Sequence, residues 1–398
     1  MTTPPEVPAV ITAPPGVVNR RLFLTLSGAG ALAVVGGPLL AACSSATSAT
    51  SATGGAGSGK IGGNLYMFTW AGYEGSTVLK NWYKQHHISL HYKSITNQDP
   101  AAVIKGPGGD QWDCSSVNQG SSQAYYNDLH ISTKITVAEV PNLANLLPFF
   151  KNSDFFKLGA GAYNCVPWTW GPIGISYRED RVKASELNSW QNLLEPKWKG
   201  RLGTFDDGNN MAWTAAVALG LDLTKITRTQ AFGPIKNWLL KLKPNLKVLS
   251  TSLGDQVNTL VAGDVDVQLV GLTFFSAQAA QQHVQVGFTT PAVEGSYGFC
   301  DCVFVPPDSN HRANALAYAN AILGGPTAVA MQNSLAQLST NATVNPQLDK
   351  SVLKFFPSDL STYSSKTLKW NRNYSDPNGP YATTTDLNTM WEQVKAGS

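Results

Sequence analysis

The 398-residue sequence predicts an exported α/β protein with enough chain for two lobes. Hydrophobic residues make up 43% of the chain and charged residues 14%, so a large apolar core can form and a mainly disordered chain is excluded. From residue 62 onward, short apolar runs alternate with longer helical stretches, which is the pattern of an α/β architecture. At roughly 100 to 200 residues per domain, the length allows two domains or lobes.

The charge balance excludes one class of partner. Lys and Arg number 29 against 26 Asp and Glu, for a formal net charge of +3. Nucleic-acid binding needs a basic stripe that neutralises phosphates, and this chain has no such excess of charge. The 11 Trp, 13 Tyr and 15 Phe indicate aromatic binding surfaces as well as cores, and therefore favour a small-molecule ligand.

Residues 1–42 form the expected export signal. Arg20 and Arg21 precede an apolar stretch that ends in small residues, as in a twin-arginine signal peptide. The stretch ends Leu-Ala-Ala-Cys, which looks like a lipobox with Cys43 as the lipidated residue. The alternative is an uncleaved anchor, because the apolar run approaches the length of a membrane span. We expect an exported lipoprotein held at the outer face of the cell membrane.

Residues 43–61 are rich in Ser, Ala, Thr and Gly and are expected to form a flexible tether. This segment contains a Gly-x-Gly-x-x-Gly string at 57–62. A dinucleotide site needs that string between a strand and a helix, and here a low-complexity repeat precedes it. The sequence therefore predicts no bound cofactor.

The folded part begins with an expected strand, helix and strand, and continues in the same alternation. Expected strands cover 64–69, 88–94, 110–115, 163–177, 201–205, 265–270 and 299–305. Expected helices cover 76–87, 189–194, 211–219, 229–243, 252–262, 313–323, 326–337 and 386–396.

Several segments in this order resemble the bacterial solute-binding lipoproteins of ABC importers, most closely the spermidine/putrescine-binding branch. They are LYMFTWAGYE (65–74), GDQWDC (109–114), VPWTWGPIGISY (166–177), NSWQNLLEPKWKGRLGTFDD (188–207), LVAGDVDVQLV (260–270), PAVEGSYGFCDCVFVP (291–306) and the closing VKAGS. Each piece is short, and the specificity comes from their order and spacing.

The resemblance implies a two-lobed, periplasmic-binding-protein-like fold of type II, with a hinge and a ligand cleft between the lobes. Residues 62–167 with about 303–345 would form the first lobe, and 168–302 with about 346–398 the second. The broken strands near 163–177 and 297–306 would be the crossings.

The resemblance also implies a set of ligand contacts, in which carboxylates meet ammonium groups and aromatic rings cover methylenes. The candidate contacts are Trp70, Tyr73, Glu74, Gln119, Asp207, Asn210, Phe299 and Asp301.

Two positions leave the ligand open. Asp207 precedes an expected helix, so it is either a ligand contact or an ordinary N-cap. Asn210 stands where the polyamine branch has a second acid, and fewer acids compensate fewer ammonium groups. A polyamine, a less charged amine and another polar solute all remain compatible with the sequence.

The cysteines beyond Cys43 bear on the expected crossings. Cys165 lies in one crossing and Cys302 in the other, so an exported chain could form a disulfide between them. Since twin-arginine export moves folded proteins, the alternative is a pair of buried thiols.

Enzyme motifs are lacking. The pair His87 and His91 has metal-ligand spacing but straddles an expected helix-to-strand boundary, and no HExxH, GxSxG or CxxC string occurs. We therefore expect no catalytic residues and no metal site. An ABC permease is the expected protein partner, and a ligand-sensing subunit of a signalling system is the alternative.

Overall fold

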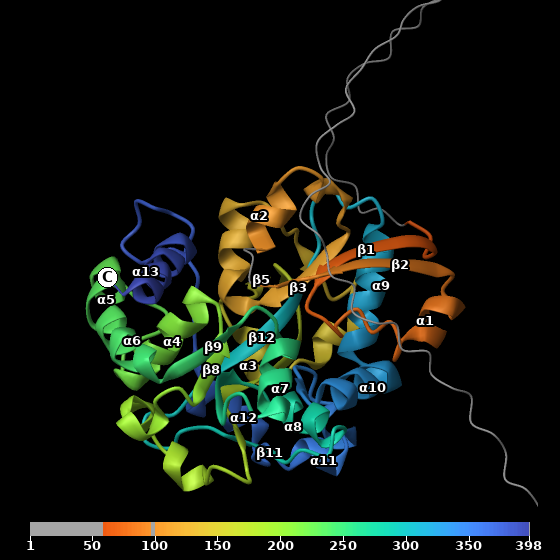
Figure 1. The fold of residues 1–398 in the computed structure, drawn as a ribbon. Coiled ribbons are helices and arrows are strands. Elements are labelled where there is room, and N and C mark those ends of the chain that lie inside the picture. Colours follow the sequence, from red (N-terminus) through yellow and green to blue (C-terminus); the bar gives the residue numbers. More distant parts are fainter. Residues whose placement is uncertain (1–58, 97–99, 398) are drawn as a thin grey trace, which may run out of the picture. The chain divides into compact units, whose positions relative to one another are not determined.

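The computed structural model describes residues 59–96 and 100–397 (Figure 1). The predicted signal peptide 1–42, the lipidation residue Cys43 and nearly all of the predicted tether 43–61 lie outside the described residues.

A long mixed sheet runs through the folded part. Its strands, in sheet order, are β2 (Ile88–Ser94), β1 (Gly63–Thr69), β3 (Cys114–Asn118), β12 (Tyr297–Phe304), β7 (Val166–Arg178), β10 (Val267–Gly271), β8 (Leu202–Phe205) and β9 (Leu246–Ser250). Beside this path, β11 (Val286–Thr289) and β13 (Leu338–Ser339) pair with β7, and β14 (Lys369–Trp370) pairs with β12. A small second sheet holds β4 (Ile135–Thr136), β6 (Ala162–Tyr163) and β5 (Lys157–Gly159).

Helices pack around both ends of the long sheet. Figure 1 shows α9 near β1 and β2, with α10 next to α9, and α4, α6 and α13 gathered beside β8 and β9. The helices are α1 (Lys80–Gln85), α2 (Pro100–Lys105), α3 (Pro148–Asn152), α4 (Gly208–Ala218), α5 (Arg228–Gln230), α6 (Lys236–Leu242), α7 (Leu253–Ala262), α8 (Thr273–Ala280), α9 (Arg312–Leu323), α10 (Gly325–Leu335), α11 (Lys350–Leu353), α12 (Leu360–Thr362) and α13 (Thr384–Ala396). The α/β architecture predicted from the sequence is confirmed.

Two separate hydrophobic cores divide the molecule, and β7 and β12 pass from one to the other. Trp168 and Trp170 of β7 are buried in the first core, whereas Ile175 and Tyr177 are buried in the second. On β12 the change falls between Phe299, in the second core, and the residues that follow it. A strand shared by two cores is suited to act as a hinge, because small torsional changes in it can reorient both packed bodies.

A third segment links the cores, near residues 371–381. Trp370 still packs in the first core, while Ala382 packs in the second. Val352 and Leu368, within the range that the sequence assigned to the second lobe, contribute to the first core. Residues 371–381 form no helix and no strand of the two sheets. Hydrophobic periodicity therefore could not predict the path of this segment.

The start of β3 differs from the expected strand at 110–115. Residues Gly109–Gln111 form a 3₁₀ turn, and the strand begins only at Cys114. A Cβ on Gly109 would lie 1.8 Å from the carbonyl oxygen of Ile104, so the turn follows α2 more closely than any other residue type permits. The expected helix at 76–87 likewise shortens to α1, with turns before it.

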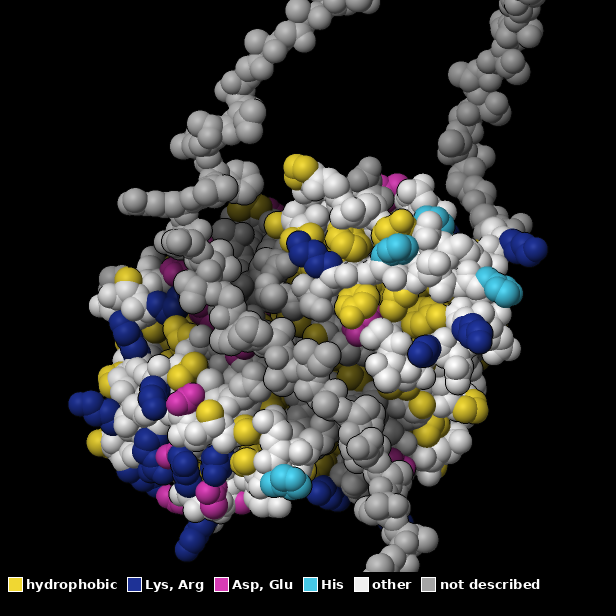
Figure 2. Space-filling model, turned by 45° about the vertical axis from the view of Figure 1, so that its right-hand side comes forward, with side chains coloured by type: hydrophobic (Ala, Val, Ile, Leu, Met, Phe, Trp, Pro, Cys, Tyr) yellow, Lys and Arg dark blue, Asp and Glu magenta, His cyan; other side chains and the backbone are white. Residues whose placement is uncertain are grey.

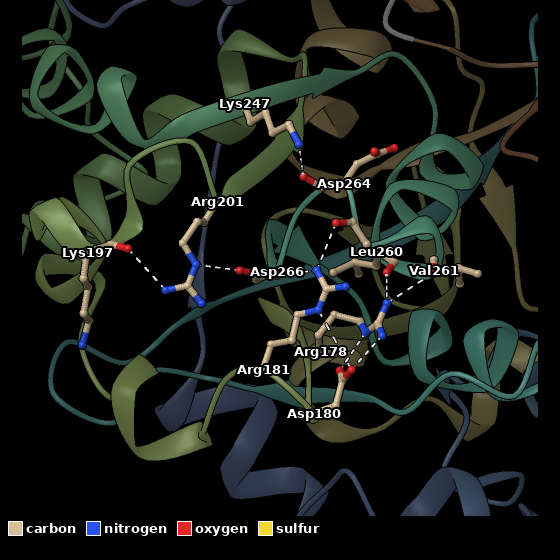
Figure 3. A network of polar contacts seen from close by, with 11 residues as sticks. Arg178, Asp180, Arg181, Lys197, Arg201, Lys247, Leu260, Val261, Asp264 and Asp266 are labelled. Carbon is tan, nitrogen blue, oxygen red and sulfur yellow. Dashed lines mark hydrogen bonds and ion pairs between the residues drawn. The ribbon is translucent and has the colours of Figure 1, made fainter.

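A network of charged side chains closes the outer end of β7 (Figure 3). Asp266 accepts hydrogen bonds from Arg181 Nη1 at 2.9 Å and Arg201 Nε at 2.6 Å, and these lower the pKa of its carboxyl although burial opposes them. Arg178 donates to the carbonyl of Leu260 at the end of α7, which satisfies a helix-terminal acceptor. Both arginines bound to Asp266 are partly exposed, so solvent screening keeps the contribution of these pairs small.

Figure 2 shows that charges of both signs are interspersed on the lower left of the visible face, while hydrophobic side chains gather on its upper right. No helix among the described residues is long and apolar enough to cross a membrane.

Candidate functional site

A cavity of about 430 Å³ lies between the two cores. Its wall includes residues just after the ends of β1, β3 and β8, together with part of β12 and the C-terminal segment. Ligands of open α/β sheets bind beyond the carboxyl ends of parallel strands, and β1 with β3 and β8 with β9 are parallel pairs. The topology therefore places the cavity where a ligand site is expected.

Asp301 is the acid buried in the cavity wall, at 5% exposure. It lies on β12 beside a register shift, where Asp301 pairs with Thr169 and the next residue with Pro167. Its Oδ2 accepts a hydrogen bond of 2.6 Å from the hydroxyl of Tyr73. Burial raises the pKa of the Asp301 carboxyl to about 7, although the bond from Tyr73 lowers it. A cation bound next to this carboxyl would stabilise its ionised form, because none of the described residues forms an ion pair with it.

Aromatic rings from both cores line the same cavity. Trp70 is half-buried, packs against both cores and lies edge-on to Phe205, with ring centroids 6.3 Å apart. Phe299 is buried at 7% exposure and lies over Gly171, where an added Cβ would stand 3.1 Å from the ring. These rings form apolar walls that can cover the methylenes of a ligand.

Asp207 lines the cavity and is also the N-cap of α4. Its Oδ1 accepts the backbone N–H of Asn209 at 2.7 Å and that of Asn210 at 3.2 Å. Burial raises the pKa of the Asp207 carboxyl, and these hydrogen bonds offset only part of that shift. The cap geometry is thus present, and a ligand contact by the same carboxylate stays a prediction.

Asn210 also lines the cavity, but its side chain has partners of its own. Its Nδ2 is 3.4 Å from Asp207 Oδ2, and its Oδ1 accepts from the Tyr297 hydroxyl at 3.2 Å. Two other wall atoms, Trp213 Nε1 and Asn209 Oδ1, are buried with no hydrogen-bond partner among the described residues.

Two of the predicted contacts do not line this cavity. Glu74 borders a neighbouring cavity of about 350 Å³, and its carboxylate is held within its own loop by Gly72 N at 2.8 Å and Ser76 Oγ at 3.1 Å. Gln119 is fully buried, and its Oε1 accepts the backbone N–H of Cys300 at 2.8 Å. This hydrogen bond holds β12 at Cys300, the residue directly before Asp301.

The C-terminal segment supplies wall residues that the sequence did not indicate. Asn373 and Tyr374 come from the third link between the cores, and Asn388 lies on α13. Lys105, at the end of α2, also lines the cavity. The run before α13 contains Asn, Pro and Gly and has the pattern of a loop, so only the tertiary structure shows that it reaches the site.

The predicted Cys165–Cys302 disulfide is absent, since both are buried free thiols in the structure, as are Cys114 and Cys300. Burial raises the pKa of the Cys165 thiol, and the neighbouring Cys302 raises it further. Both side chains are buried in the first core, and their sulfurs are not joined.

Comparison with known proteins identifies the family. A family model described as "Bacterial extracellular solute-binding protein" matches residues 121–357. The putrescine-binding periplasmic protein PotF of Escherichia coli K12 is 23% identical over 310 residues, which cover 72% of this chain and 80% of PotF. The spermidine/putrescine-binding periplasmic protein of the same strain is 23% identical over 341 residues, covering 84% of this chain and 92% of the relative.

Solved structures share the fold. The spermidine/putrescine substrate-binding protein PotD of Streptococcus pneumoniae superposes with a TM-score of 0.65 at 18% identity, over 84% of this chain and 99% of PotD. The Tp0655 (TpPotD) lipoprotein of Treponema pallidum gives a TM-score of 0.60 at 18% identity, over 83% of this chain and 99% of that one. The predicted two-lobed fold and the resemblance noted in the sequence are both confirmed. The chain belongs to the family of bacterial extracellular solute-binding proteins.

Proposed function

We propose that this protein captures a small amine in the cleft between its lobes, outside the cytoplasm, and delivers it to an ABC importer. The observation that carries the proposal is Asp301, a buried carboxyl group in an aromatic-walled cavity, with which no described cationic side chain forms an ion pair. Relatives named as putrescine- and spermidine/putrescine-binding proteins support an amine as the ligand class. Since these relatives bind solutes, they also favour binding over catalysis.

The chemistry of the wall fits an amine. A primary ammonium group donates three hydrogen bonds and carries a charge that the Asp301 carboxylate can meet. Trp70 and Phe299 offer ring faces and edges to a flexible carbon chain, and a cation near a ring gains further attraction. Tyr73 holds the acceptor oxygen of Asp301 in place before the ligand arrives.

Closure of the lobes is the proposed means of capture. We take residues 62–170 with 300–345 as the first moving body and 173–299 with α13 as the second, because Trp170 and Cys300 pack in the first core and Ile173 and Phe299 in the second. The packing of Val352 and Leu368 in the first core supports joining residues 346–370 to the first body. A ligand favours the closed state only through its higher affinity for that state.

Titration of the purified full-length protein with a panel of amines, amino acids and sugars tests the function. A bound amine should reduce the radius of gyration in small-angle scattering and change tryptophan fluorescence, because Trp70 lies at the cleft and Trp168 and Trp170 lie on a crossing strand. Tight binding of a sugar or an inorganic anion, with no amine bound, contradicts the proposal. A tight amine that leaves the scattering curve unchanged contradicts closure alone.

We further propose that residues 1–42 are removed as a signal peptide and that lipid on Cys43 anchors the protein through the tether 43–61. The twin-arginine pair and the lipobox support this order of events. Cell fractionation of wild type and Cys43→Ala tests it. The wild type should pellet with membranes, and the variant should either keep its signal peptide or be recovered in the soluble fraction. Equal distribution of processed wild type and variant contradicts lipidation.

A further inference from the structure

The charged side chains in the cavity wall are few and of both signs. Asp207, Asp301 and Lys105 line the cavity. The other polar side chains in its wall, such as Asn118, Asn209, Asn373, Thr384 and Asn388, are amides and hydroxyls. The described wall therefore contains two formal negative charges and one positive charge.

The charge of Asp207 is compensated in part within the protein. Its Oδ1 accepts two backbone N–H groups at the start of α4, and its Oδ2 faces the amide of Asn210. A carboxylate at a helix N-terminus is stabilised by the cap bonds and by the positive end of the helix dipole. Since three hydrogen bonds already reach Asp207 and one reaches Asp301, Asp207 gains less than Asp301 from an ammonium group of the ligand.

Asp301 and Lys105 lack this compensation. The hydrogen bond that Asp301 receives comes from the neutral Tyr73 hydroxyl. Lys105 is exposed at the end of α2 and forms no ion pair with any of the side chains that the structure describes. One carboxylate and one ammonium group of the wall are thus left for the ligand to pair.

A polyamine can pair with Asp301 but offers no negative group to pair with Lys105. One of its ammonium groups can pair with Asp301, but each further one is left facing neutral amides, the capped Asp207, or Lys105 itself. Two like charges 4 Å apart repel by about 1 kcal/mol in water and about 4 kcal/mol near a protein surface. A buried charge without a partner carries a further desolvation cost.

We infer that the ligand is a zwitterion, a small molecule with one ammonium group that pairs with Asp301 and one carboxylate that pairs with Lys105. The cavity of about 430 Å³ leaves room for a short carbon chain between the two groups. This inference rests on the proposed amine-binding function and narrows its ligand class.

Matched ligands test the inference without changing chain length. Putrescine and 4-aminobutyrate each separate their charged groups by a similar short chain, and differ in carrying a second ammonium group or a carboxylate. Cadaverine and 5-aminopentanoate form the next longer pair. Titration calorimetry on the full-length protein should show the amino acid of at least one pair binding about tenfold or more tighter than its diamine.

Variants at Lys105 test whether this side chain causes the preference for an amino acid over its diamine. Lys105→Gln should weaken binding of the preferred amino acid about 5- to 30-fold, and leave the diamine unchanged or bound more tightly. Lys105→Arg should retain most of the preference, because the charge is kept. Lys80→Gln, on the exposed side of α1 and outside both cavities, is the matched control and should change nothing.

The outcomes of these titrations distinguish failure of the zwitterion inference from failure of the proposed amine binding. If putrescine or spermidine binds more tightly than every amino acid tested, the zwitterion inference is wrong and amine capture stands. The inference also fails if Lys105→Gln weakens an amino acid and its diamine alike. If neither diamines nor amino acids bind, amine capture and the inference fail together.

Discussion

Asp301→Asn is expected to weaken binding of the preferred amine by about 30-fold to several thousand-fold, because it removes one partner of a desolvated charge pair at a cost of roughly 2 to 5 kcal/mol. The asparagine keeps the size of the side chain and an acceptor for the Tyr73 hydroxyl, so the wall changes in charge and little in shape. Titration calorimetry of wild type and variant with the same ligand measures the loss.

A second buried carboxylate provides the control. Glu74 is also buried, but it borders the neighbouring cavity, and its oxygens accept hydrogen bonds from its own loop. Glu74→Gln should therefore leave amine affinity within about twofold. An equal loss in both variants would show that overall negative charge, and not a direct pair at Asp301, controls binding.

Most of the fold could be predicted from the sequence where local pattern and tertiary role agree. The alternating run at 88–94 became β2 with the same bounds, and the apolar stretch at 252–262 became α7 behind its Ser252 cap. The run at 273–280 was not predicted as a helix, because its two neighbouring phenylalanines show no clear amphipathic periodicity. Tertiary packing, with Phe275 fully buried, stabilises α8 instead.

Part of the site could also be predicted from the sequence, because several of its residues lie at strand ends or within recognisable motifs. Trp70, Asp207 and Asp301 follow or interrupt strands and were identified by motif, and all three line the cavity. Gln119 was also a candidate contact, but its side chain binds the backbone of β12, and sequence spacing does not encode the direction of a side chain. Lys105 lies at the end of a short helix with no motif, so its place in the wall became visible only from the tertiary structure.

Amine affinity is expected to depend on pH through Asp301. In the free protein burial raises the pKa of this carboxyl to about 7, and a bound ammonium group lowers it because it stabilises the ionised form. Affinity should therefore be constant above pH 7 and fall about tenfold for each unit below it, until the pKa of the complex is reached.

The same carboxyl affects the stability of the free protein with the opposite sign. Its folded-state pKa lies above the value of about 3.9 for an unfolded chain, so its contribution is complete below that value and is lost as pH rises toward 7, by about 1.4 kcal/mol per unit. Tyr73 does not titrate in this range, because burial raises the pKa of its hydroxyl well above 10. Calorimetric titrations and chemical denaturation between pH 5 and 8.5 should thus show affinity rising while the Asp301 contribution to unfolding free energy falls. Asp301→Asn should remove both trends, and a variant that keeps the wild-type slope in affinity would assign the titration to another group.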